Sequence, residues 1–450
     1  MSHPTQVGII GAGISGLAAA YRLHEAGCAV QVFEANDHAG GVIRTTRRNG
    51  FLVEEGPNSI NGAGPALAGV MRDLGLDNAR VESNPKARNR FVVRNARPVP
   101  IPQSLSDFVR TPLLSARAKA RLFTEPFRTR GPANESLARF VARRLGPEVL
   151  DYAVNPFVAG VYGGRPDKLA VQHAFPALKS MEKEHGSLFI GGIRSALRGA
   201  NASEEPTVNG LFSFEDGLDT LPRTLAAHLH EQMHLGCPVH ALVPTDAGWR
   251  IEHAAGSTTV DAVVYAAPLH TLGTEVTFGT SLPLHPLHDV PYAPMRSVSL
   301  GFKRDAVSHP LDGFGMLLPA AESSFEILGT IFASTLFPKR APDGHVLLTT
   351  FVGGARAPEH AHADPDAARA LVMRDLQRLL GVTDDPVFSH QVVWPHAIPQ
   401  YTSRHGAVKG RLDALEAAHS GLQFAGNYRT GISVEDAFDS GWHAADTLLA

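Results

Sequence analysis

Hydrophobic and polar positions at the start of the chain predict a strand, a helix and a second strand in quick succession. Residues 7–10 form a short apolar run of strand type, and residues 17–26 repeat apolar side chains at helical spacing. Gly27 is a typical helix stop, and residues 29–33 are a second strand-like run. This order predicts a βαβ unit and hence an α/β domain.

The glycines between the first strand and the helix predict a dinucleotide-binding turn. Gly11, Gly13 and Gly16 have the spacing GxGxxG. Gly11 permits a tight turn, Gly13 lets the backbone approach a pyrophosphate, and Gly16 lets the helix pack closely on the strand. The N–H groups at the helix start would face the phosphates. Glu34 ends the second strand, where a carboxylate suits a free ribose hydroxyl, so NAD and FAD are both candidate ligands.

The stretch after the second strand favours FAD. Gly40, Gly41 and Arg44 form a GGxxRT sequence, which resembles the amine-oxidase-like superfamily of FAD proteins. In that superfamily this turn helps to hold the pyrophosphate from the far side. The alternative for these residues taken alone is a Gly-Gly hairpin turn.

The middle of the chain predicts the end of a first lobe and then a mainly helical insertion. The first lobe is expected to add a strand with a turn fixed by Pro57 (residues 51–60), a helix (66–74) and a hairpin with Asn95 near its tip (88–102). Prolines break residues 105–198 into short helical segments. Within them, PFVAGVYGG at 156–164 favours a tight loop, a simple turn or close approach to a flat ligand. Residues 201–209 are polar and predict a surface loop.

The second half predicts a return to α/β structure around a second sheet. Strand-like runs occur at 211–214, 239–243, 249–253, 260–267, 297–302, 313–319, 327–332, 346–352 and 422–425. Residues 280–395 are expected to form the second sheet lobe, entered through a linker at 282–294 and carrying an amphipathic helix at 364–380. Ser433 and Asp436 predict a capping box at the start of a final helix. A helix start attracts negative charge and would favour a reduced flavin, although an ordinary capped helix has the same sequence pattern.

Composition adds few constraints. The 450 residues are 44% hydrophobic and 19% charged, which is typical of a globular protein of two or three domains. Cys28 and Cys237 are too few for a disulfide framework, so buried thiols in a reducing compartment are expected. The apolar start has no basic flank and is not interpreted as a secretory signal, and no run of 18 uncharged apolar residues predicts a spanning helix.

Charge is distributed unevenly along the chain. The net charge is −3, which argues against nucleic acid as a general partner. Residues 86–144, however, contain fourteen Lys and Arg against three acidic residues. This segment is either a solvated face or a surface for an anionic membrane or anionic substrate.

Histidines are numerous but do not predict a metal site. The chain has 22 of them, and the clusters nearest to a ligand pattern are His228, His230 and His234, and His360 with His362. We assign no metal to them and interpret them as scattered solvated or core histidines, because they have no cysteine partners. GxSxG and P-loop motifs are absent from the sequence.

Motifs along nearly the whole chain resemble the protoporphyrinogen oxidase family of late haem biosynthesis. They are GAGISGLAAAYRL with Glu34, GGVIRT, EEGPNSI, NRF at 89–91, RRLGPEV, PFVAGVYGG, FGMLLP, LGTIFASTLFP, TTFVGG, AIPQY and GNYRTGISVEDA. So many motifs in this order are specific to that family. Resemblance to the wider superfamily covers only the FAD-binding pieces.

The resemblance implies a fold of three parts, with α/β and α+β character. A Rossmann-like FAD-binding domain would be assembled from the split segments 1–60, 205–278 and 392–450. A mixed-sheet substrate domain would comprise 61–104 and 279–391, and a helical, membrane-associating domain 105–204. The protein would be cytoplasmic, on the inner face of the cytoplasmic membrane, and its basic segment would face anionic lipid.

The resemblance also implies a set of site residues. Arg90 matches an arginine that pairs with a substrate propionate, for which a guanidinium fork is well suited. Phe351, Leu317 and Ile331 match apolar residues that sandwich the macrocycle, with Ile331 in place of a leucine found in some relatives. Asn58 and Gly160 match positions beside the flavin and the reacting ring. The expected FAD-binding residues are Gly11, Ala12, Gly13, Ile14, Ser15, Gly16, Glu34, Ala35, Gly40, Gly41, Arg44, Gly56, Pro57, Asn58, Val239, Ala267, Trp394, Gly426, Asn427, Ile432, Ser433 and Val434.

The implied reaction is the FAD-dependent oxidation of protoporphyrinogen IX to protoporphyrin IX with O₂ as the acceptor. Substrate carbon would give hydride to the flavin over three two-electron rounds, so no catalytic acid or base is assigned. A homodimer and handover to a ferrochelatase are implied partners. The alternatives are coproporphyrinogen III oxidation, an amine oxidase or carotenoid desaturase, and a flavin- or porphyrin-binding protein without turnover. Arg90 favours the first substrate, since the coproporphyrinogen branch often lacks this arginine.

Overall fold

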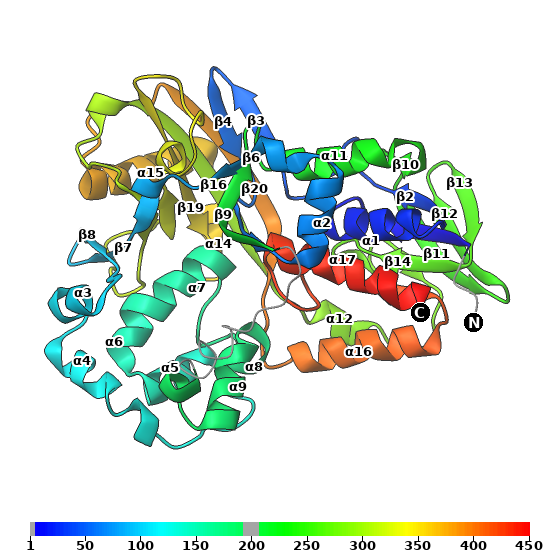
Figure 1. The fold of residues 1–450 in the computed structure, drawn as a ribbon, viewed down its shortest axis with the longest axis horizontal. Helices are drawn as coiled ribbons and strands as arrows, with labels where there is room; N and C mark the ends of the chain where they lie inside the picture. The colour runs from blue at the N-terminus through cyan, green and yellow to red at the C-terminus, as the bar shows by residue number, and fades with distance from the viewer. Residues whose placement is uncertain (1–4, 192–206) are drawn as a thin grey trace.

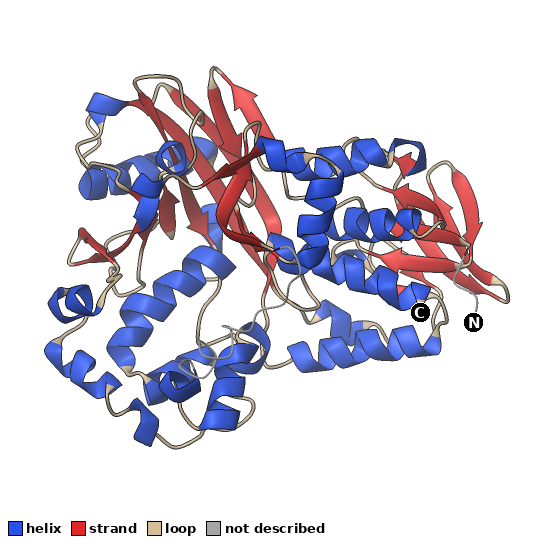
Figure 2. Cartoon of the chain, in the orientation of Figure 1, coloured by secondary structure: helices blue, strands red, loops and turns tan. Residues whose placement is uncertain are grey.

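The computed structural model describes residues 5–191 and 207–450. Strands gather in two groups, a parallel sheet beside both termini and a large mixed sheet at the other end of the molecule (Figures 1 and 2). A group of helices lies below the mixed sheet in this view. The fold is therefore mixed α/β, as the sequence predicts.

The parallel sheet is built around the predicted βαβ unit. Its order is β10 (Met233–His234), β2 (Ala29–Phe33), β1 (Gln6–Ile10), β14 (Ala262–Tyr265) and β21 (Leu422–Phe424). Helices α1 (Ile14–Glu25), α2 (Pro65–Asp73), α11 (Thr220–His228) and α17 (Val434–Leu449) enclose one apolar core with it. Strands from three distant parts of the chain thus form one Rossmann-like sheet.

Smaller sheets surround this unit. They are β13 (Gly256–Val260), β12 (Gly248–His253), β11 (Val239–Thr245) and β15 (Thr277–Phe278); β3 (Thr45–Arg48) and β4 (Phe51–Glu54); and β5 (Ile60–Ala63), β9 (Val208–Phe214) and β6 (Arg80–Glu82). Cys28 and Cys237 are both buried, as expected. The predicted strand at 260–267 is shorter than expected, because β13 ends at Val260 and β14 begins after a turn.

The mixed sheet has seven strands in the order β20 (Phe388–Pro399), β16 (Tyr292–Lys303), β19 (His345–Gly353), β18 (Gly329–Ile331), β17 (Gly313–Leu317), β7 (Asn89–Arg94) and β8 (Arg97–Pro100). The predicted hairpin at 88–102 is its edge, with Asn95 in the turn at a φ of 52°. Helix α15 (Pro365–Leu380), capped by Asp364, packs its apolar side on one face of the sheet. The other face is directed toward the rest of the molecule and carries the residues considered below.

Residues 105–191 are helical, as predicted. The helices are α3 (Leu105–Arg110), α4 (Ala116–Leu122), α5 (Leu137–Arg144), α6 (Pro147–Val149), α7 (Asn155–Tyr162), α8 (Val171–Ala174) and α9 (Pro176–His185). A buried ion network holds them together, because Arg144 is fully buried against Glu125 and Glu182 at 2.9 Å each. Across the described ranges, none of the helices has the length and apolar content needed to cross a membrane.

Three expectations about local structure are wrong or incomplete. Most of the segment 156–164 belongs to helix α7 and is not a loop, because Pro156 suits the first turn and Gly163 ends the helix at a φ of 57°. The linker at 282–294 contains helix α12 (His285–His288) and the start of β16. Helix α16 (His405–Ala418) and strand β20 were not predicted. The loop expected at 201–209 lies mostly outside the described residues.

Candidate functional site

The glycine turn between β1 and α1 has the geometry of a phosphate cradle. Gly11 has a φ of 98°, and a Cβ on Gly16 would lie 1.9 Å from the Gly11 carbonyl oxygen. A Cβ on Gly13 would meet no atom within 4 Å, so the space beside the turn is open there. Gly13 is also the N-cap of α1 and provides no side-chain cap for the first amides of the helix. Ala12, Ile14 and Ser15 fill the rest of the turn and are buried. An anion can therefore be accommodated at this end of α1.

Glu34 lies directly against the glycine turn. It is buried, one carboxylate oxygen accepts the Ala12 amide at 2.7 Å, and the other accepts the Asn36 amide at 3.0 Å and the Asn36 side chain at 2.6 Å. A carboxylate offers about four acceptor positions, so one position is left for a ribose hydroxyl. Ala35, the next residue, is exposed. The predicted pairing of the turn with a carboxylate thus occurs in the fold.

The second glycine turn packs on the first. Gly40 pairs with Gly13 in a β-bridge and donates its amide to the Ala12 carbonyl at 2.8 Å, while a Cβ on Gly41 would lie 3.3 Å from the Gly13 Cα. Arg44 follows this turn and pairs with Glu55, with 3.4 Å between Nε and Oε2. Both predicted pyrophosphate turns therefore enclose one space. Glu55 is a partner that the sequence analysis missed.

The start of α17 points to the same region. Ser433 and Asp436 form a capping box at the start of this helix. The Asp436 carboxylate accepts the Ser433 amide, and the Ser433 hydroxyl accepts the Asp436 amide, whereas the capping box does not engage the Val434 amide. Helix α17 is fixed on α1, because Ser15 Oγ donates to the Ala437 carbonyl at 2.6 Å and a Cβ on Gly441 would lie 1.9 Å from the Ser15 carbonyl oxygen. The amino ends of α1 and α17 consequently lie close together.

The other predicted FAD-binding residues fall on segments around these turns. A Cβ on Gly56 would lie 2.0 Å from the Val42 carbonyl oxygen, so the 56–58 turn packs on the 40–44 turn. Trp394 of β20 donates its indole N–H to the Glu55 carbonyl at 2.8 Å. Pro57 and Asn58 continue the turn after Glu55; Val239 begins β11; Ala267 follows β14; and Gly426, Asn427 and Ile432 lie between β21 and α17.

The apolar residues predicted to contact substrate share one face of the mixed sheet. Leu317 is opposite Gly329, and Gly329 is opposite Phe351, so these residues form one row across β17, β18 and β19. Ile331 lies two positions beyond Gly329 and hence on the same face. On β16 and β20 the pair Met295 and Trp394 extends this face. Strand register alone therefore brings residues of five strands to one surface.

Helix α7 covers part of this face. A Cβ on Gly160 would lie 2.3 Å from Leu317 Cδ2, so the missing side chain lets the helix approach the sheet. Gln400 of the AIPQY motif is buried and donates to the Tyr162 carbonyl at 2.8 Å, which fixes the end of α7. The glycine-rich segment permits a close approach, as expected, and these contacts bring α7 close to the mixed sheet.

Arg90 lies at the strand beside β17. It is opposite Gly315, which in turn is opposite Ile331. Its guanidinium is exposed, lies 5.6 Å from the centroid of the Phe314 ring, and forms no ion pair with any carboxylate in the described ranges. Arg90 is therefore a cation available to an anionic ligand at this end of the sheet face.

A buried charged pair adjoins the predicted pocket and was missed by sequence reasoning. Glu54 and Arg340 lie 3.4 Å apart and line a cavity of about 10 Å³ with Asn58 and Ile331, which has room for one water at most. Burial raises the pKa of Glu54 to about 7, against the opposing effects of Arg340 and the Thr45 hydroxyl. The two adjacent glutamates of the EEGPNSI motif were the only sequence feature that could have pointed to these contacts. Only the fold shows that Glu54 faces Arg340 and that Glu55 faces Arg44.

Comparison with known proteins gives consistent matches over the whole chain. The family model of flavin containing amine oxidoreductases matches residues 14–449. Protoporphyrinogen oxidase 2 of Arabidopsis thaliana is 35% identical and aligns with 99% of this chain and 94% of its own length. Coproporphyrinogen III oxidase of Bacillus subtilis is 27% identical, covering 98% and 97%.

Solved structures show the same fold. A proposed protoporphyrinogen oxidase from Exiguobacterium sp. 255-15 superposes with a TM-score of 0.82 at 23% identity, covering 99% of this chain and 98% of its own. A putrescine oxidase variant superposes with a TM-score of 0.70 at 16% identity, covering 99% of both chains. The arrangement of a parallel sheet, a mixed sheet and intervening helices is thus shared with these oxidases.

Proposed function

The chain belongs to the flavin containing amine oxidoreductase family, and on that premise we propose that it is an FAD-dependent oxidase that converts protoporphyrinogen IX to protoporphyrin IX with O₂ as the acceptor. The 35% identity with a protoporphyrinogen oxidase over nearly the whole chain supports a porphyrinogen as the substrate. The alternative is coproporphyrinogen III, because a coproporphyrinogen III oxidase is 27% identical over a similar length.

The residues around the glycine turns fit the flavin cofactor of the family. The open space at Gly13 and the uncapped start of α1 suit the pyrophosphate, and Glu34 keeps an acceptor position for the ribose. Trp394, fixed by the Glu55 carbonyl, connects this region to the mixed sheet. When bound, the flavin supplies two-electron oxidation and reduction of O₂. The protein's own contribution is to bind, orient and shield.

The single observation that carries the proposed function is the sheet face with Arg90 beside it. Leu317, Ile331 and Phe351 provide an apolar surface for a flat macrocycle, and α7, which packs on Leu317 at Gly160, would border it. A propionate of the substrate would pair with the exposed Arg90 guanidinium. Burying an apolar ring while one carboxylate meets a cation fixes the orientation of the ring. Asn58, at the cavity beside Ile331, would orient the reacting edge.

The helical segment would dock on an anionic membrane surface. Its exposed apolar side chains are Leu105 (86% exposed), Val109 (71%), Phe123 (77%) and Phe127 (87%). Arg110, Arg117 and Arg130 are exposed in the same segment, whereas Arg143 and Arg144 are neutralised by internal carboxylates. The basic excess at the surface is therefore smaller than in the sequence. Apolar side chains interspersed with cations fit the interface of anionic lipid.

The division into domains is part of the same proposal. Segments 1–60, 205–278 and 392–450 would bind FAD, segments 61–104 and 279–391 would bind substrate, and 105–204 would contact the membrane. The site would lie at the junction of the first two. A homodimer and handover of product to a ferrochelatase stay predictions, which light scattering and coupled haem synthesis would test.

The proposal is tested by porphyrin fluorescence in air. Purified flavin-loaded protein receives protoporphyrinogen IX or coproporphyrinogen III, with protein-free blanks for autoxidation. Faster formation of protoporphyrin supports the proposal, and faster formation of coproporphyrin assigns the chain to the alternative. Retained flavin without either product would favour a binding protein. Arg90→Ala is compared with Arg97→Ala, an exposed arginine on the neighbouring strand β8 that serves as the matched control.

A further inference from the structure

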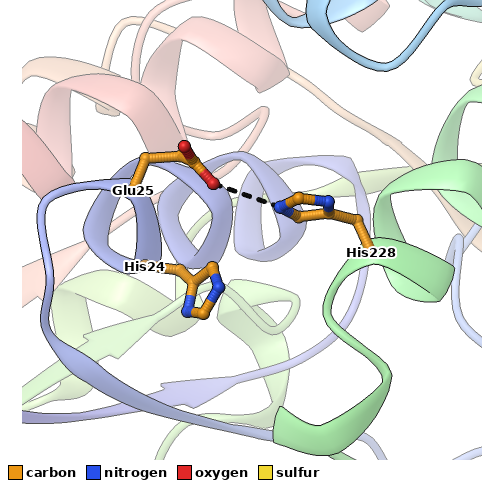
Figure 3. Close-up of side chains that lie close together, drawn as sticks. All are labelled: His24, Glu25 and His228. Carbon is orange, nitrogen blue, oxygen red and sulfur yellow. Dashed lines mark hydrogen bonds and ion pairs between the residues drawn. The ribbon is translucent and has the colours of Figure 1, made fainter.

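Three potential metal ligands meet on the surface of the Rossmann-like unit, away from the site described above. His24 and Glu25 end α1, and His228 ends α11 (Figure 3). Helix α1 has twelve residues and is therefore about 18 Å long, with the glycine turn at its other end. The sequence analysis assigned no metal to His228, and Glu25 is far from it in the chain. The fold supplies Glu25.

The side-chain distances are close to those of a coordination sphere. His228 Nε2 and Glu25 Oε1 are 3.1 Å apart, and one ligand atom from each of the three residues lies within 4.8 Å of the others. Two ligands of a tetrahedral Zn²⁺ at about 2.0–2.1 Å are about 3.3 Å apart. The pair of His228 and Glu25 already has this spacing. His24, which is partly buried, would need to move by at most about 1.5 Å, which a side-chain rotation provides.

The local electrostatics favour a cation. His24 and His228 lie in the last turns of their helices, where the negative ends of the two helix dipoles favour a cation. Glu25 adds a full negative charge. The Tyr21 ring packs against the His228 ring at 5.3 Å between centroids, which restricts the imidazole near the carboxylate. The negative charge and the restricted position of the His228 ring therefore both favour binding of a cation.

We propose that His24, Glu25 and His228 bind a divalent transition metal ion of the Zn²⁺ type. Two imidazoles and one carboxylate are a donor set for Zn²⁺, Ni²⁺ or Cu²⁺, whereas Mg²⁺ and Ca²⁺ prefer sites made of oxygen. The ion takes the position of the proton shared by His228 and Glu25 and clamps α11 to α1. The half-exposed side chains leave room for water as the remaining ligand.

The experiment uses the full, flavin-loaded chain without a histidine tag. Zn²⁺ affinity is measured by competition with a chelating indicator, and Co²⁺ absorption reports the coordination geometry. We expect His228→Ala and His24→Ala each to lower the affinity at least about tenfold, since even partners outside the coordination sphere are worth 10- to 100-fold. His230→Ala is the matched control, because its side chain is 74% exposed on the turn after α11 and lies outside the triad.

Thermal unfolding provides a second measurement. Zn²⁺ is expected to raise the melting temperature of the wild-type protein and of His230→Ala, and EDTA to reverse the increase. Acidification should weaken binding, because protons compete for both imidazoles. The proposal is wrong if the affinity is the same in His228→Ala and wild type, or if His230→Ala loses it equally. Oxidase activity is a separate readout, since the triad lies away from the proposed flavin site.

Discussion

Replacing Gly441 by alanine should separate α17 from α1 and weaken FAD binding. A Cβ at this position would lie 1.9 Å from the Ser15 carbonyl oxygen and 2.7 Å from the Ser15 carbonyl carbon. Both contacts are to the backbone of α1, so no side-chain rotation relieves them. The two helices must move apart by more than 1 Å, and the amino ends of both helices border the proposed pyrophosphate site.

The expected loss of stability is about 3 kcal/mol. Overpacking in a rigid core costs about 1–3 kcal/mol, and a backbone clash belongs at the upper end of that range. Separation of the helices also strains the 2.6 Å hydrogen bond from Ser15 Oγ to the Ala437 carbonyl, which is worth about 1 kcal/mol. The higher helix propensity of alanine returns about 1 kcal/mol. Overpacking dominates this balance.

The matched control is Gly410→Ala in α16. Gly410 is exposed within that helix, and a Cβ there would meet no atom within 4 Å. This variant should gain about 1 kcal/mol from helix propensity alone. Urea unfolding followed by circular dichroism gives the stabilities, and the release of flavin fluorescence gives cofactor retention. If Gly441→Ala unfolds at the wild-type urea concentration and keeps its FAD, the close packing of α1 on α17 is refuted.

Three further predictions concern the sheet face, the pH dependence of folding and the membrane. Arg90→Ala should raise KM for the porphyrinogen about 10- to 100-fold while flavin content stays unchanged, because only a charge-assisted contact is removed; loss of flavin would contradict this role. Burial raises the folded-state pKa of Glu54 to about 7, so the free energy of unfolding should fall by about 3 kcal/mol as pH rises from about 4.5 to 7. Burial lowers the pKa of His405 to about 3, so the free energy of unfolding should also fall as pH drops below about 6.5. These slopes oppose each other, and urea unfolding between pH 4.5 and 6.5 should show stability rising with pH in Glu54→Gln and falling in His405→Phe; parallel slopes would refute the assignments. The double variant Phe123→Ser/Phe127→Ser should reduce cosedimentation with anionic vesicles, whereas the control Val387→Ser, at an exposed position between α15 and β20, should not. If vesicle binding does not depend on salt, the proposed attraction between the basic side chains and anionic lipid is wrong.

Much of the Rossmann-like unit could be predicted because its signals are local. Strand β2 occupies the predicted residues 29–33, and the glycine turn and Glu34 meet as expected. Glycine spacing and short apolar runs directly constrain the backbone near them. The capping box of Ser433 and Asp436 was predicted for the same reason. Segment 156–164 was interpreted wrongly, because its glycines suggested a turn while its apolar residues and Pro156 favour a helix packed on the sheet.

By itself, then, the sequence determined the βαβ unit, both glycine turns, the helical insertion and the family resemblance. Only the tertiary structure decided which side chains meet. Leu317, Ile331 and Phe351 share one face because of strand register, and a shift of one residue would turn each of them to the opposite face. The contacts of Glu55 with Arg44 and of Glu25 with His228 join different elements. Such contacts depend on how whole elements pack, and no local pattern of residues encodes them.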